Sequence, residues 1–85
     1  MNNYDFEILE AAIKYLELSK VDIKSFCQDI GVEFRCLWSI LLGEKTSDEI
    51  GRKIMSEVHI RYPEIMRKAM MYSHKHNNLE KTLLI

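Results

Sequence analysis

Glycine and proline are scarce in this 85-residue chain, which has three glycines and one proline. Both residues are common in turn-rich and disordered proteins, so their scarcity argues against those classes. Hydrophobic residues make up 47% of the chain and charged residues 29%, which is enough apolar surface for one core. The composition therefore predicts a single compact helical domain over residues 1–85.

Long apolar runs are also absent, since no stretch approaches the roughly 20 residues needed to cross a bilayer. The first residues, Met-Asn-Asn-Tyr-Asp, lack the basic and apolar stretches of a secretory signal. We therefore expect a cytoplasmic protein that does not associate with membranes.

Cysteine and histidine are too few and too scattered to predict a metal site. Cys27 and Cys36 have no other Cys or His at ligand spacing, and His59, His74 and His76 are expected on the surface. Buried, reduced thiols are expected at both cysteines, with a disulfide between them as the alternative. The chain has no glycine-rich phosphate loop, no His-Glu-x-x-His motif and no nucleophile beside a base. The sequence thus predicts neither an enzyme nor a cofactor.

Charge is unevenly distributed along the chain. Residues 1–50 hold five Lys/Arg against ten Asp/Glu, whereas residues 51–85 hold seven against three. The basic second part is either an ordinary solvated surface or a positive face for phosphate or an acidic partner.

Apolar periodicity predicts three helices in the first half of the chain. The first runs from Tyr4 to Leu18 and carries one stripe of apolar residues, at Phe6, Leu9, Ile13 and Leu16. The second has Asp22 as its N-cap and ends at Gly31, a residue that readily adopts the left-handed conformation after a helix. The third runs from about Glu33 to Leu42 and stops at Gly43.

Two further helices are expected in the second half. Thr46-Ser47-Asp48-Glu49 has the Thr-x-x-Glu form of a capping box, and the apolar residues that follow it have helical spacing. Pro63 suits the first turn of a fifth helix with a broad apolar face, which consists of Ile65, Met66, Ala69, Met70 and Tyr72. Asn77-Asn78 offers a stop, and an apolar tail, Leu79 to Ile85, follows.

Residues 21–58 contain short motifs in a specific order and spacing. They read Phe26-Cys27-Gln28-Asp29-Ile30-Gly31-Val32, then Leu37 and Ile40, then Leu42-Gly43-Glu44-Lys45, then Ser47-Asp48-Glu49-Ile50 and Ile54. This pattern resembles the helix-turn-helix of Cro/C1-type phage repressors. The resemblance implies an all-α, five-helix, lambda-repressor-like domain with an apolar C-terminal extension. Gly31 would make the turn, and Val32, Leu37 and Ile40 would anchor the following helix.

The resemblance also implies that the third helix enters the major groove of double-stranded DNA. Carried over position by position, the expected base contacts are Phe34, Arg35 and Ser39. Arg35 suits guanine, because a guanidinium can bind this base through two hydrogen bonds. The expected phosphate contacts are the Ile23 end of the second helix, the loop around Lys45, and Arg52 and Lys53 at the start of the fourth helix.

Several positions depart from that family's pattern. Apolar residues replace the usual polar ones at Ile23, Phe34, Trp38, Leu41 and Leu42. Phe34 and Trp38 are four residues apart and therefore share one helix face. Three environments are open for them: burial beneath the fifth helix or the C-terminal tail, an interface with a second copy or another protein, or contact with thymine methyl groups or sugars in DNA.

The sequence therefore supports two functional hypotheses. The first is a small DNA-binding transcriptional regulator of phage or mobile-element type, a homodimer that pairs through residues 62–85, including Met70 and Leu83. The second is a helix-turn-helix reused for protein interaction, as in an antirepressor, an inhibitor of a host factor or an adaptor. In that case Trp38, Leu41 and Leu42 would bind the partner.

Overall fold

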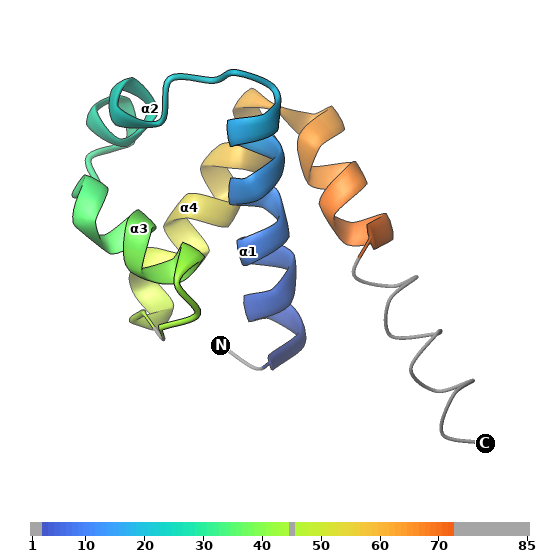
Figure 1. The fold of residues 1–85 in the computed structure, drawn as a ribbon, viewed down its shortest axis with the longest axis horizontal. Coiled ribbons are helices and arrows are strands. Elements are labelled where there is room, and N and C mark those ends of the chain that lie inside the picture. The colour runs from blue at the N-terminus through green and yellow to red at the C-terminus, as the bar shows by residue number, and fades with distance from the viewer. Residues whose placement is uncertain (1–2, 45, 73–85) are drawn as a thin grey trace.

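The computed structural model describes residues 3–44 and 46–72, and this part of the chain is helical with no strand. The all-α class expected from the sequence is confirmed. The helices are α1 (Asn3–Leu18), α2 (Ile23–Ile30), α3 (Phe34–Leu41), α4 (Asp48–Arg61) and a further unlabelled helix over residues 63–72 (Figure 1).

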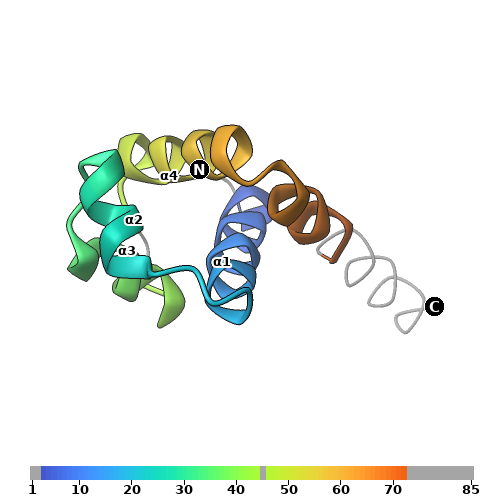
Figure 2. The ribbon, with the colours of Figure 1, turned by 90° about the horizontal axis from the view of Figure 1, so that it is seen from above.

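The central helix is α1, which packs against both α3 and α4, while α2 packs against α3. The helix of residues 63–72 lies on the other side of α1 from α2 and α3 in both ribbon views (Figures 1 and 2). This arrangement leaves the outer side of α3 uncovered by that helix.

One continuous core holds the helices together. The predicted stripe on α1 is confirmed for Leu9, Ile13 and Leu16, which are fully buried, whereas Phe6 is half-buried at its edge. The other large, fully buried aliphatic residues come from α3 and α4, namely Leu37, Ile40, Ile54 and Val58. Each such side chain contributes about 1.5–3 kcal/mol to folding through its removal from water.

A left-handed residue forms the turn between α2 and α3. Asp22 caps α2, because its carboxylate accepts a hydrogen bond of 3.2 Å from the backbone N–H of Ser25. Gly31 ends the helix with φ 75° and ψ 31°, and the N–H of Val32 then donates to the carbonyl oxygen of Cys27 at 3.0 Å. The predicted hinge at Gly31 is therefore present, and the buried Val32 follows it.

The predicted capping box of the fourth helix is wrong by one residue. The N-cap of α4 is Ser47, whose hydroxyl oxygen accepts a hydrogen bond of 3.2 Å from the N–H of Ile50. Thr46 precedes the cap, and Asp48 and Glu49 occupy the first turn, where the helix dipole favours negative charge. The third helix likewise begins at Phe34, after an extended Glu33, instead of at Glu33.

The helix of residues 63–72 begins at Pro63, as predicted, but its buried face is narrower than expected. Ile65, Met66 and Ala69 are buried, whereas Met70 and Tyr72 are about half exposed. Met70 lies at the edge of this face, about 140° around the helix axis from Ile65. Asn77, Asn78 and the apolar tail with Leu83 lie outside the described residues.

Gly31→Ala tests the hinge. A Cβ at this position would lie 3.5 Å from Nζ of Lys53, an ordinary contact, so the cost comes from the backbone conformation alone. We expect the free energy of unfolding to fall by about 1–2 kcal/mol in urea titrations. Gly31→Asn is the matched control and should lose less, because asparagine tolerates the left-handed region. Equal stability of wild type and Gly31→Ala would contradict this account.

Candidate nucleic-acid interface

Helix α3 has one buried face and one accessible face. Leu37 and Ile40 are fully buried, which confirms their predicted role as anchors. The opposite face carries one stripe at helical spacing, which consists of Arg35, Trp38, Ser39 and Leu42. Arg35, Trp38 and Leu42 are exposed, and Ser39 is half-buried between them. The segment predicted to project outward therefore does so.

Among the described residues, the two polar side chains of this stripe form only local hydrogen bonds. The side chain of Arg35 is 84% exposed, and its guanidinium donates to the carboxylate of Glu33 at 2.9 Å. An exposed ion pair of this kind contributes about 0–1 kcal/mol, so a stronger partner can displace Glu33. The hydroxyl of Ser39 donates to the carbonyl oxygen of Arg35 at 3.1 Å.

Phe34 and Trp38 form a stacked aromatic pair on α3. Their ring centroids are 6.0 Å apart with an angle of 26° between the planes, and the ammonium of Lys24 lies 5.6 Å from the centroid of Phe34. Phe34 is half-buried against the core, and Trp38 is 49% exposed. The proposed base reader Phe34 thus has Trp38 and Lys24 against its ring, and Trp38 is the aromatic side chain that projects.

One of the three predicted environments was burial of this pair beneath the fifth helix. That prediction is wrong, because the helix of residues 63–72 does not cover the pair. That helix lies on the opposite side of α1 (Figures 1 and 2). The C-terminal tail, which was the other predicted cover, lies outside the described residues.

A shallow groove of about 280 Å³ adjoins the aromatic pair. It lies between the ends of α1, α2 and α3 and is lined by Glu17, Asp22, Ile23, Lys24, Phe34, Trp38 and Leu41. Ile23 and Leu41, two of the unexpected apolar residues, are half-buried in its wall. The carboxylates of Glu17 and Asp22 make this groove a poor site for phosphate.

One of the predicted phosphate contacts, Lys53, lies near the hinge. Arg52 and Lys53 are exposed on the first half of α4, and Nζ of Lys53 reaches to within 3.5 Å of the Cβ position at Gly31. The structure thus brings Lys53 to the turn between α2 and α3. Lys45 lies outside the described residues.

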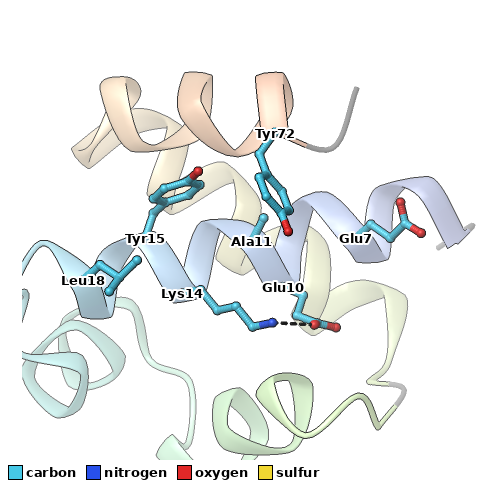
Figure 3. A pocket seen from close by; sticks show the side chains of 7 residues that line it. All are labelled: Glu7, Glu10, Ala11, Lys14, Tyr15, Leu18 and Tyr72. Atoms are coloured by element: carbon cyan, nitrogen blue, oxygen red, sulfur yellow. Dashed lines mark hydrogen bonds and ion pairs between the residues drawn. The ribbon is translucent and has the colours of Figure 1, made fainter. Parts of the chain in front are cut away.

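A second groove, of about 490 Å³, was not predicted from the sequence. It lies between α1 and the helix of residues 63–72 and is lined by Glu7, Glu10, Ala11, Lys14, Tyr15, Leu18 and Tyr72 (Figure 3). Lys14 donates to Glu10 at 3.1 Å, and the rings of Tyr15 and Tyr72 meet edge to face at 6.4 Å. The sequence signal for this groove was Leu18, an exposed apolar residue on an otherwise polar face of α1.

The cysteines and histidines do not converge on a site in the described part of the chain. Both thiols are free, with Cys27 buried and Cys36 half-buried. Burial, and secondly the nearby Cys36 thiol, raises the pKa of Cys27, which lowers its fraction of reactive thiolate. Residues 3–44 and 46–72 contain no cluster of three metal-ligating side chains, and no helix there is long and apolar enough to span a bilayer.

Comparisons with protein-family models, with curated proteins and with solved structures find no match to this chain. The function must therefore be inferred from the geometry of α3 and its surroundings.

Phe34→Ala tests the support of Trp38, the only tryptophan of the chain and hence its only indole fluorophore. Loss of the stacked ring exposes the indole, so the emission maximum should move to longer wavelength and acrylamide quenching should increase. The unfolding free energy should also fall, by about 0.5–1.5 kcal/mol for the ring pair and more for the lost burial. Tyr72→Ala removes an aromatic ring on the other side of α1 and should leave the emission unchanged. Unaltered fluorescence in Phe34→Ala would rule out the stacked arrangement.

Proposed function

We propose that this protein is a small, sequence-specific DNA-binding regulator of phage or mobile-element type, which acts in the cytoplasm as a homodimer. The observation that carries the proposal is the pairing of a left-handed Gly31 with a following helix whose outer stripe is accessible. A short helix presented in this way is the element that helix-turn-helix proteins insert into the major groove.

Arg35 and Ser39 supply the polar chemistry for reading bases. The guanidinium of Arg35 is exposed and held only by a surface ion pair, so guanine N7 and O6 compete with Glu33 for it. Ser39 offers a hydroxyl that can donate or accept after it leaves the carbonyl oxygen of Arg35. Phe34 contributes mainly by supporting Trp38.

Lys53, with Arg52 and Lys45, supplies the electrostatic attraction to phosphates. The ammonium of Lys53 lies at the hinge, which would approach the DNA backbone. Neutralising phosphates releases counterions, so binding should weaken steeply as salt is added.

A homodimer supplies the affinity that one α3 lacks. Eight helical residues span about 12 Å, enough for only about three base-pair steps. The exposed Met70 and Met71 place apolar surface on the helix of residues 63–72. Two copies that pair there would present two reading helices to a two-fold-related operator.

Substitution of the basic residues tests this function. Against a duplex selected from a random library, Arg35→Ala should weaken binding by about 1–3 kcal/mol, and Lys53→Ala should reduce the salt dependence by about one unit of slope. Arg61→Ala, at the opposite end of α4 from Lys53, is the control and should bind as the wild type does. Fluorescence anisotropy over a salt series measures both effects. Unchanged binding in both variants, or no salt-sensitive binding by the wild type, would refute the proposal.

A second candidate, protein interaction through α3, is favoured by one specific observation. Trp38 and Leu42 are 49% and 65% exposed and lie beside a groove that carries Glu17 and Asp22. Exposed tryptophan is a frequent anchor of protein interfaces, and these carboxylates suit a basic or polar partner rather than phosphate.

Trp38→Ala separates this candidate from the first. If α3 binds a protein, the wild type should cross-link to a partner, and the complex should form again from the purified components. Trp38→Ala should lose this partner, whereas Leu18→Ala should retain it. The wild type should then show no salt-sensitive retention on heparin. A partner that binds Trp38→Ala normally would exclude α3 as the interaction surface.

A further inference from the structure

We infer that Trp38 reads a thymine base in the major groove. This inference rests on the proposed DNA-binding function and deepens it by naming a base preference. It starts from the position of Trp38 on the outer stripe of α3, three residues after Arg35 and directly before Ser39.

The indole of Trp38 is both held and accessible. Phe34 stacks against it at 6.0 Å, and Lys24 lies against the ring of Phe34, so the pair is supported from α2. About half of Trp38 nevertheless remains open to solvent. A side chain ordered in this way loses little rotamer freedom on binding, which favours a specific contact.

The chemistry of the indole matches thymine better than the other bases. In the major groove, thymine presents a C5 methyl group next to the O4 acceptor. An indole offers an apolar ring for the methyl group and a single N–H donor for O4. Cytosine presents an N4 donor instead and lacks the methyl group, so the same indole would lose the apolar contact and oppose donor to donor.

The neighbouring residues predict where the thymine lies. Arg35 and Trp38 are separated by about 4.5 Å along the helix axis, between one and two base-pair steps of about 3.4 Å. A guanine bound by Arg35 should therefore stand one or two base pairs from the thymine in each half-site. Leu42, one turn beyond Trp38, extends the apolar surface in the same direction.

Removal of single thymine methyl groups from the DNA tests the inference. A duplex is first selected with the wild-type protein, and each thymine is then replaced singly by deoxyuridine, which removes only the methyl group. We expect one position per half-site at which the replacement weakens binding about fourfold, the effect of one buried methyl-sized group. Trp38→Ala should bind the thymine and deoxyuridine duplexes equally. Arg35→Ala should bind both more weakly but keep the fourfold ratio.

The outcomes distinguish failure of this inference from failure of the proposed DNA-binding function. If the wild type enriches a sequence but is indifferent to every deoxyuridine, or if Trp38→Ala keeps the ratio, DNA binding stands and thymine reading by Trp38 is wrong. If the wild type enriches no sequence and shows no salt-sensitive binding, both proposals fall, and the exposed indole is left to a protein partner. Circular dichroism of each variant verifies that the helices are retained.

Discussion

The outward presentation of α3 depends on one constraint, the positive φ of Gly31 combined with the burial of Leu37 and Ile40. The glycine fixes the angle at which the chain leaves α2, and the two aliphatic residues fix the rotation of α3 about its axis. Together they determine which residues of α3 face solvent. Arg35, Trp38, Ser39 and Leu42 thus form the outer stripe because of contacts made on the opposite side of the helix.

Most of the fold follows from local sequence, because apolar spacing and glycine placement act over a few residues. The helices, the hinge and the buried stripe of α1 could all be predicted in this way. The cap of α4 could not, since Thr46 and Ser47 have similar propensities and the path of the preceding loop decides between them. Periodicity also gives the apolar face of a helix but not its partner. The side of α1 on which residues 63–72 pack was therefore beyond prediction, and with it the exposure of Trp38.

The accessible stripe of α3 offers a partner apolar surface more than net charge. The first fifty residues carry twice as many acidic as basic side chains, and Glu33 already occupies the guanidinium of Arg35. If the protein binds DNA as proposed, long-range attraction to this polyanion can come from the start of α4, where Arg52 and Lys53 lie exposed. In the proposed complex, α3 would supply the base contacts and the start of α4 the phosphate contacts.

A chain of contacts joins α2 to α3, since the ammonium of Lys24 lies over the ring of Phe34 and this ring stacks on the indole of Trp38. The chain begins with a cation on α2 and ends with Trp38, the more exposed of the two rings on α3. A change of residue 24 would therefore act on the indole through the ring of Phe34. If α3 reads DNA as proposed, a substitution on α2 can therefore change which base pairs the protein prefers.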